Sequence, residues 1–189
     1  LEPAVRAALA GGVRLVQYRD KGDDRDRRLA EARQLVALCH EHDARLIIND
    51  DPELAREAGA DGVHLGRDDV GVAEARELLG PTPLIGVSCY NQLERAIAAQ
   101  AAGADYVAFG SFHPSPTKPD AVRAPLGLLK RAREFIHLPI VAIGGITPDN
   151  AAPIALAGAD AAAVISGVLA ADDITAAARE LNNLMRLHW

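Results

Sequence analysis

Charged side chains follow short apolar runs at two places in the first third of the chain. Gln17-Tyr18-Arg19-Asp20-Lys21 follows one run, and Asn49-Asp50-Asp51 follows the next. If the first run is a strand, alternation places Gln17, Arg19 and Lys21 on one face, which would point into the molecule. Burying two such cations without a partner is costly. The group therefore predicts an anion-binding site, unless Arg19 and Lys21 form ion pairs with Asp20 or Asp50.

Two pairs of adjacent carboxylates, Asp50-Asp51 and Asp68-Asp69, follow neighbouring apolar runs. Mg²⁺ binds one or two carboxylates and takes its remaining ligands from water and substrate phosphates. Asp50 and Asp69 are the predicted metal ligands. Asp51 precedes a proline and is expected to cap the following helix, and Asp68 fits a solvated loop equally well.

Three further segments carry groups that bind phosphate. Ser115-Pro116-Thr117-Lys118-Pro119 offers two hydroxyls and an ammonium on a semi-rigid backbone, although an ordinary polar turn has a similar composition. Gly144-Gly145-Ile146-Thr147 and Ile165-Ser166-Gly167 follow apolar runs, and such turns can present backbone N–H groups to an anion. A diphosphate at the cationic end and a monophosphate at the glycine-rich end would fit both halves of the pattern.

A repeat indicates which elements position these residues. Ala58-Gly59-Ala60-Asp61 recurs at 102–105 and 157–160, with a weaker copy at 10–12, and each copy precedes an apolar run. A helix that ends at a left-handed glycine and is followed at once by a buried strand explains the pattern. Continuous apolar runs are typical of parallel strands that are covered on both faces.

The expected strands are the seven runs 13–16, 45–48, 62–65, 84–87, 106–109, 139–143 and 161–165. Amphipathic segments lie between them, such as 26–42 and 91–101, where Asn91 and Glu94 form a capping-box pattern. This alternation fits an open doubly wound sheet or a (β/α)8 TIM barrel. The repeat precedes every second strand, and the chain opens on a helix-like segment at 2–10, which favours the barrel. We therefore expect one α/β TIM-barrel domain over 1–189 that holds strands two to eight, with the first strand before Leu1.

Composition excludes several classes of protein. The chain has 189 residues, of which 49% are hydrophobic and 24% charged, an ordinary balance for a globular protein. Its net charge of −6 argues against a duplex-DNA binder. The longest uncharged stretch, 135–148, is shorter than the roughly 20 residues of a membrane span. Cys39 and Cys89 are the only cysteines, so a disulfide framework is not expected and a cytoplasmic location fits.

In their order along the chain, these segments resemble the thiamine-phosphate synthase family over essentially the whole length. The matching stretches are Gln17-Tyr18-Arg19-Asp20-Lys21, Ile47-Ile48-Asn49-Asp50-Asp51, Gly62-Val63-His64-Leu65-Gly66, Gly86-Val87-Ser88, Gly103-Ala104-Asp105-Tyr106, Thr117-Lys118, Ile143-Gly144-Gly145-Ile146 and Ile165-Ser166. The resemblance implies a (β/α)8 barrel that joins hydroxymethylpyrimidine diphosphate to hydroxyethylthiazole phosphate. The products would be thiamine phosphate and pyrophosphate, and Mg²⁺ would be required.

The resemblance also implies residue roles. Pyrophosphate and its Mg²⁺ would be held by Arg19, Lys21, Asn49, Asp50, Asp69 and Lys118. The thiazole phosphate would be held by Ser115, Thr117 and the backbone at Gly145, Ile165 and Ser166. Ser88 would lie beside the pyrimidine, and Gln17 would help to order the diphosphate end. The residues expected to act in catalysis are Arg19, Lys21, Ser88 and Lys118.

Some positions depart from the family pattern, so alternatives stay open. Arg67 stands where the family often has Gln, Tyr90 where it often has His, and Ser115 where it usually has Thr; the roles of Arg67, Tyr90 and His113 are not assigned. One alternative is a thiazole tautomerase-like or regulatory paralogue on the same barrel, and another is a phosphate-binding barrel without this activity. The expected partners are small-molecule substrates, not nucleic acid or membrane, and a homo-oligomer is possible. His64 is expected to be a hydrogen-bonded core residue.

Overall fold

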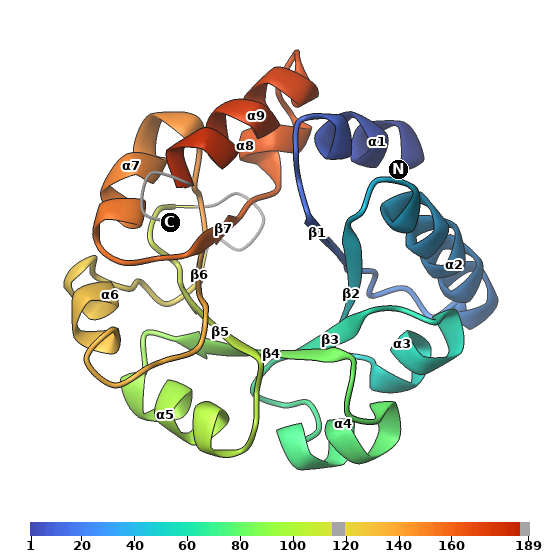
Figure 1. The fold of residues 1–189 in the computed structure, drawn as a ribbon, viewed down its shortest axis with the longest axis horizontal. Helices are drawn as coiled ribbons and strands as arrows, with labels where there is room; N and C mark the ends of the chain where they lie inside the picture. Colours follow the sequence, from blue (N-terminus) through green and yellow to red (C-terminus); the bar gives the residue numbers. More distant parts are fainter. Residues whose placement is uncertain (115–119, 186–189) are drawn as a thin grey trace.

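The computed structural model describes residues 1–114 and 120–185. Its parallel strands form one curled sheet in chain order, and the helices surround it (Figure 1). The strands are β1 (Leu15–Tyr18), β2 (Arg45–Asn49), β3 (Gly62–Leu65), β4 (Leu84–Tyr90), β5 (Tyr106–Gly110), β6 (Ile140–Ile143) and β7 (Ala161–Ala163). The α/β architecture of the prediction is confirmed, with a strand in each of the seven expected runs.

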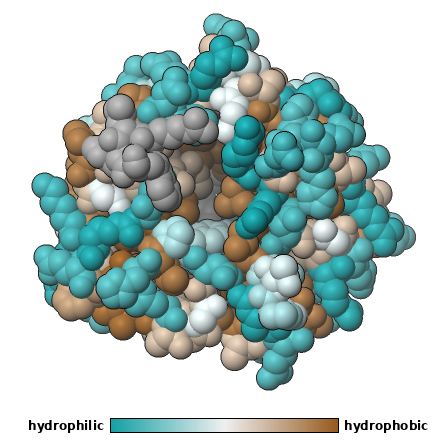
Figure 2. Space-filling view, viewed as in Figure 1, coloured by the Kyte–Doolittle hydropathy of each residue, from teal (hydrophilic) through white to brown (hydrophobic). Residues whose placement is uncertain are grey.

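The helices alternate with these strands on the outside of the sheet (Figure 1). They are α1 (Glu2–Ala10), α2 (Arg25–Glu41), α3 (Pro52–Ala58), α4 (Val72–Leu79), α5 (Leu93–Ala101), α6 (Gly127–Ala132), α7 (Pro148–Leu156), α8 (Ser166–Leu169) and α9 (Ile174–Met185). Because every neighbouring strand pair is parallel, all strands end at the same rim. In the same view, the centre of the molecule is hollowed (Figure 2).

The repeat serves the opposite rim, where strands begin. Its glycines Gly59, Gly103 and Gly158 have φ of +70°, +88° and +109°, the left-handed conformation expected at helix ends. Each repeat aspartate also accepts a hydrogen bond from a strand N–H and contacts a basic residue that lies in a helix or directly after one. For Asp61, Asp105 and Asp160, the N–H groups are those of Leu46, Ile85 and Ile140, and the basic residues are His40, Arg76 and Arg133. The repeat therefore ties helices to strands away from the candidate site.

The sheet has two edges, β1 and β7, and their side chains are more exposed than those of the central strands. All residues of β3 and β5 are buried, whereas Leu15 of β1 is 42% exposed and β7 exposes Ala161 and Ala163. The helix layer is continuous at the same place, because Thr175 Oγ1 of α9 donates to the Ala7 carbonyl of α1 at 2.9 Å. Within the described residues the structure is therefore a seven-stranded, curled half-barrel, and the predicted closed barrel of eight strands is not confirmed.

One predicted helix start is wrong. The capping box of Asn91 and Glu94 does not form, because α5 begins at Leu93 with Gln92 as its N-cap. β4 continues to Tyr90, and the Gln92 N–H donates to the Cys89 carbonyl at 2.9 Å, which delays the helix. Asn91 Nδ2 instead donates to the Arg123 carbonyl at 3.3 Å. None of the helices in the described part of the chain combines the length and apolar character that crossing a membrane requires.

Candidate active site

Asp50 lies directly after β2 and joins two segments at the common rim. Its N–H donates to the His64 carbonyl at 2.8 Å, which extends the β2–β3 ladder by one residue. Its φ of +68° is left-handed, a conformation in which Asp is more frequent than most residues. The Lys21 ammonium donates to Asp50 Oδ2 and forms an ion pair with it. The sequence left open whether Lys21 binds an anion or forms an ion pair with Asp20 or Asp50. The structure shows the ion pair with Asp50.

The two predicted metal ligands lie together. Asp50 and Asp69 are close enough for their carboxyl groups to share a hydrogen bond, and Asp69 Oδ2 accepts one from the Gly66 N–H at 2.6 Å. Burial raises the pKa of Asp69, and the negative charge of Asp50 adds to that increase although the Gly66 N–H opposes it. Burial is the largest single effect on Asp50 and acts in the same direction, but hydrogen bonds with Lys21 and Asp69 and the charges of Lys21 and Arg19 together outweigh it and lower the pKa of Asp50. A proton shared by the pair is therefore assigned to Asp69.

The first group of predicted anion-binding residues is more exposed than the alternation argument assumed. Gln17 and Arg19 are exposed, and the Lys21 side chain retains 59% of its exposure. The expected burial of these cations is therefore wrong, since β1 is an edge strand and ends at Tyr18. The positive charge of Arg19 nevertheless contributes to the lowered pKa of Asp50, which places both groups in one electrostatic environment.

Asp51 has the capping role that the sequence predicts. Its carboxylate accepts a hydrogen bond from the Leu54 N–H at 2.9 Å at the start of α3. It also accepts one from Arg28 of α2 at 3.0 Å. A cavity of about 640 Å³ adjoins these residues between the segments after β1 and β2 and the helices α2, α3 and α4, and Lys21, Asn49 and Asp50 also line it.

Ser88 lies in β4 beside a buried polar pair. His64 Nε2 is 2.8 Å from Ser88 Oγ, and His64 Nδ1 is 3.0 Å from the Tyr106 hydroxyl. Gly86 makes room for this arrangement, because a Cβ there would lie 1.9 Å from Cζ of Tyr106. Burial raises the pKa of the Tyr106 hydroxyl, so this group is neutral near pH 7. The prediction that His64 is a hydrogen-bonded core residue is confirmed.

The glycine-rich segments after β6 and β7 lie against one another. A Cβ on Gly167 would be 2.3 Å from the Ile146 carbonyl oxygen, so the second turn packs directly on the first. Gly144 and Gly145 have φ of +95° and +60°, and a Cβ on Gly145 would be 2.2 Å from the Pro114 carbonyl oxygen. Thr147 precedes α7, and its N–H donates to Asn150 Oδ1 at 2.9 Å. Ile165 and Ser166 are exposed.

Three predicted residues, Ser115, Thr117 and Lys118, lie outside the described residues. His113 is described: burial lowers its pKa, and the charge of Arg123 contributes in the same direction. Among residues 1–114 and 120–185, no cluster of three or more His, Cys, Asp or Glu side chains is arranged to hold a metal ion. For a metal ion bound in this part of the chain, the candidate protein ligands are the two carboxylates of Asp50 and Asp69.

Sequence reasoning missed two arginines that support the site. Arg28 lies one turn into α2, and Arg95 of α5 donates to the carbonyls of Ser88 and Gly66 at 2.7 and 2.8 Å. Both belong to helices on the outside of the sheet, where an arginine usually faces solvent. Only tertiary packing shows that these two reach the rim.

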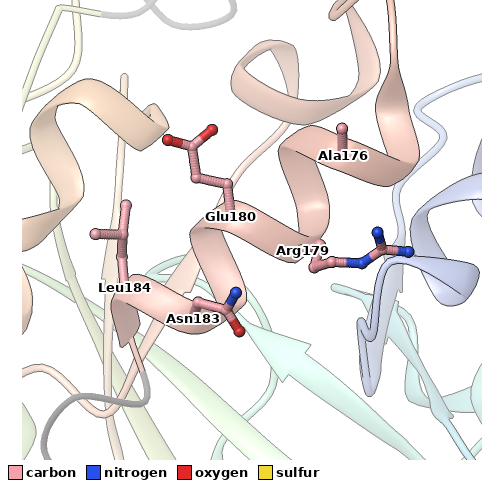
Figure 3. A pocket seen from close by; sticks show the side chains of 5 residues that line it. All are labelled: Ala176, Arg179, Glu180, Asn183 and Leu184. Atoms are coloured by element: carbon pink, nitrogen blue, oxygen red, sulfur yellow. The ribbon is translucent and has the colours of Figure 1, made fainter.

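A second hollow, of about 400 Å³, lies elsewhere on the molecule. Its described lining comes from one helix, α9, and consists of Ala176, Arg179, Glu180, Asn183 and Leu184 (Figure 3). In the close-up, the Arg179 and Glu180 side chains extend in different directions along the helix. None of the predicted site residues in the described part of the chain lines this hollow. The rim of the sheet therefore remains the candidate site.

Comparisons with known proteins agree with the fold and also show which family the chain resembles. The family model described as thiamine monophosphate synthase matches residues 1–168. A thiamine-phosphate synthase of Thiobacillus denitrificans is 61% identical over 180 residues, which cover 95% of this chain and 85% of that protein. One of Nitrosococcus oceani is 57% identical over 175 residues, covering 93% of this chain and 81% of that protein. Among solved structures, thiamine phosphate pyrophosphorylase from Pyrococcus furiosus has a TM-score of 0.89 at 37% identity, covering 97% of this chain and 88% of that one.

Proposed function

Since the chain belongs to the thiamine-phosphate synthase family, a family of transferases, we propose that it joins hydroxymethylpyrimidine diphosphate to hydroxyethylthiazole phosphate and releases pyrophosphate. One observation carries the choice of a diphosphate substrate. The Asp50–Asp69 pair and the Lys21 ammonium lie together at the rim of the sheet, so a metal-binding group and a cation adjoin one another. A protein that binds only a monophosphate has no need of this combination.

The residues present fit Mg²⁺ as the bound ion. Two carboxylates in contact suit a hard cation, which would relieve their mutual repulsion and take its other ligands from water and phosphate oxygens. Asn49 ends β2 immediately before Asp50 and lines the same cavity, so its side-chain oxygen can serve the same end of the site. When bound, Mg²⁺ would stabilise negative charge on the leaving pyrophosphate.

The chemistry requires the protein mainly to bind, orient and stabilise charge. The pyrimidine C–O bond breaks and its electron pair leaves with pyrophosphate, while the ring amino group stabilises the resulting cation. Arg19, Lys21 and Lys118 stabilise the leaving group. The thiazole nitrogen then forms the new C–N bond with its own lone pair. This nitrogen carries no proton, so the reaction needs no general base, and orientation supplies much of the remaining acceleration.

The other substrate groups are assigned to the remaining predicted residues. Ser88, held by His64, would contact the pyrimidine, and Gln17 on the exposed face of β1 would order the diphosphate. The thiazole phosphate would lie at the packed turns after β6 and β7 and would be held there by the backbone at Gly145, Ile165 and Ser166. Ser115 and Thr117 would supply hydroxyl donors to the same phosphate.

We also propose that an eighth parallel strand completes the barrel between β1 and β7. The proposal is supported by the exposed side chains on both edges, beneath a helix layer that α1 and α9 already close. Its test compares residues 1–189 with a chain extended at its N-terminus by the residues that its gene encodes. Hydrogen exchange should slow at Leu15–Tyr18 and Ala161–Ala163 in the longer chain, and unchanged exchange there would contradict the proposal.

The function is tested by supplying the two phosphorylated precursors with Mg²⁺ and following thiamine phosphate and pyrophosphate by chromatography. Equal amounts of the two products are expected. In a separate reaction, the carboxylated thiazole phosphate alone should not isomerise. The resemblance implies that the tautomerase relatives move the proton with a His two residues after the serine of β4, and the chain has Tyr90 at that position. Isomerisation without pyrophosphate release would support a tautomerase, and ligand binding without either product would support a non-catalytic barrel.

For domain organisation, location and partners, we propose one cytoplasmic domain whose partners are its small-molecule substrates.

A further inference from the structure

Tyr90 stands at the end of β4 and has no part in the function proposed above. Its φ of +56° is left-handed, which is rare for a residue with a bulky side chain. The pairing of β4 with β5 shifts between Ser88 and Tyr90, so Cys89 is the extra residue of a local bulge. Bulges of this kind change the direction of the next side chain and occur often beside active sites. The backbone therefore directs the tyrosine ring away from the regular course of the strand.

The redirected side chain contacts the turn that follows β3. The Tyr90 hydroxyl accepts a hydrogen bond from the Arg67 N–H at 3.3 Å, and the Arg67 guanidinium carbon lies 4.7 Å from the ring centroid. The Arg95 guanidinium carbon is 5.9 Å from the same centroid, and Arg95 donates to the Gly66 carbonyl at 2.8 Å. Stacked cations and hydrogen bonds thus connect Tyr90 to residues 66 and 67.

The same turn positions Asp69. The Gly66 N–H donates to Asp69 Oδ2 at 2.6 Å. A Cβ at Gly66 would lie 3.0 Å from Asp69 Oδ2, 3.7 Å from the Tyr90 hydroxyl oxygen and 3.9 Å from Asp50 Oδ1. Gly66 is therefore surrounded by both carboxylates and the hydroxyl, and any displacement of residue 66 moves the hydrogen bond that holds Asp69.

We propose that Tyr90 is a positioning residue for the Asp50–Asp69 pair. Arg67 and Arg95 bind its ring, and the ring in turn fixes Gly66, so that Asp69 presents its carboxylate beside Asp50 before a cation arrives. Two adjacent carboxylates repel one another when ionised, so the turn must be held by contacts other than their own. The inference rests on the proposed function, because that function assigns metal binding to the carboxylate pair that Tyr90 would position. It also assigns roles to Arg67 and Tyr90, where the chain departs from the family pattern.

Mn²⁺ binding tests the proposal without turnover. Free Mn²⁺ is followed by electron paramagnetic resonance as it is titrated into the protein, first alone and then with inorganic pyrophosphate. Tyr90→Leu removes the hydroxyl and the ring, and its Mn²⁺ affinity is expected to fall about 10-fold or more, as for other partners of metal ligands. Tyr90→Phe keeps the ring and should retain most of the affinity, which separates stacking from hydrogen bonding.

A matched control is available at the end of another strand. Tyr18 ends β1, but its hydroxyl donates to Glu31 of α2 at 2.6 Å and, more weakly, to Asp20 at 3.4 Å, and it has no hydrogen bond to Asp50 or Asp69 among the described residues. Tyr18→Phe should therefore leave Mn²⁺ affinity unchanged, although its melting temperature is expected to fall. If Tyr90→Leu does not fold, Arg67→Ala removes the stacked guanidinium from an exposed position and should weaken Mn²⁺ binding several-fold.

The outcomes separate this proposal from the function on which it rests. Wild-type Mn²⁺ binding with equal affinity in folded Tyr90→Leu and Arg67→Ala overturns the positioning role and leaves the metal pair intact. A wild-type protein that binds no Mn²⁺ in either titration overturns both. Steady-state kinetics add a second readout: the KM for Mg²⁺ should rise in Tyr90→Leu while the KM for the thiazole phosphate stays constant. A Tyr90→Leu variant that loses only thermal stability would also contradict the proposal.

Discussion

Asp50 and Asp51 are adjacent in the chain, yet their carboxylates serve different partners. Asp50 has a φ of +68° and pairs with Lys21, whereas Asp51 has a φ of −118°, caps α3 and binds Arg28 at 3.0 Å. The left-handed backbone of Asp50 therefore gives its carboxylate a different set of partners from that of its extended neighbour Asp51. This difference makes the two positions a natural pair for mutagenesis.

We predict that Asp50→Asn and Asp69→Asn each abolish most of the Mg²⁺-dependent turnover while the protein stays folded. Each change removes one charged ligand from a pair that has no third carboxylate within the described residues. Activity is measured at limiting and saturating Mg²⁺, with circular dichroism to verify folding. The exposed neighbour Asp68 is the control, and Asp68→Asn should keep near-normal activity. Near-normal turnover of both variants at limiting Mg²⁺ would show that the metal assignment is wrong.

In contrast to the variants of Asp50 and Asp69, Asp51→Ala should lower the stability of the protein. It removes an N-cap, which typically costs about 1 kcal/mol, and leaves the largely buried Arg28 without its carboxylate. A total loss of about 1–3 kcal/mol corresponds to a fall in melting temperature of roughly 2–10 °C for a domain of this size. Thermal unfolding measures it, with Asp51→Asn as the control that keeps the cap. An unchanged melting temperature for Asp51→Ala would contradict the structural role.

We predict that stability falls in alkaline solution because two thiols are buried. Burial raises the pKa of Cys39 from 9.0 to about 11 and that of Cys89 to about 12. The unfolded chain ionises first, so this stability is complete below about pH 9 and is lost as pH rises toward the folded pKa values. The loss is about 1 kcal/mol per thiol at pH 10.

The measurement is the midpoint of urea unfolding between pH 8 and pH 10.5. Cys89→Ala should unfold more easily at every pH because it leaves a small cavity, but its stability should depend less on pH than that of the wild type. An identical pH dependence in the two proteins would exclude Cys89 as a source of the effect.

Much of the fold could be predicted because the repeat encodes it locally. A glycine that must be left-handed, followed by an apolar run, marks the end of a helix and the start of a strand, as at Gly59 and Gly158. Similarly, Asp51 could be assigned as a cap because proline and the first turn of the helix follow it directly. In each case the physical cause lies within a few residues of the chain.

The remaining features depend on contacts between distant segments. Alternation placed Gln17 and Arg19 on one face but could not show how exposed that face is on β1, the edge strand of the described sheet. The contact between Arg28 and Asp51 joins α2 to the start of α3, and no local spacing predicts it. The left-handed backbone of Tyr90 likewise has no local signal, which is why the expected capping box at Asn91 was wrong.

Lys21 links the electrostatics of the site to its chemistry. Its ammonium hydrogen bonds to Asp50 and favours the ionised form of Asp50, while its charge acts in the same direction on Asp69. Lys21→Ala should therefore raise the pKa of both carboxylates. Because the metal binds the ionised pair, activity at limiting Mg²⁺ should fall at a higher pH than in the wild type. Turnover measured from pH 5 to pH 8 at two Mg²⁺ concentrations tests this shift. If turnover of Lys21→Ala falls in acid at the same pH as that of the wild type, the prediction is contradicted.

Lys21→Ala should also slow the chemical step if, as we propose, the ammonium stabilises charge that grows as pyrophosphate departs. Losing one such donor typically costs about 100-fold in rate. Single-turnover experiments on the plateau of the pH profile, where turnover of both proteins no longer changes with pH, separate this loss from the altered protonation. We propose that the thiazole phosphate binds at the other end of the site, so its KM should change little. An unchanged single-turnover rate with a raised KM for the thiazole phosphate would place Lys21 at the wrong end of the site and contradict the proposed arrangement of the two substrates.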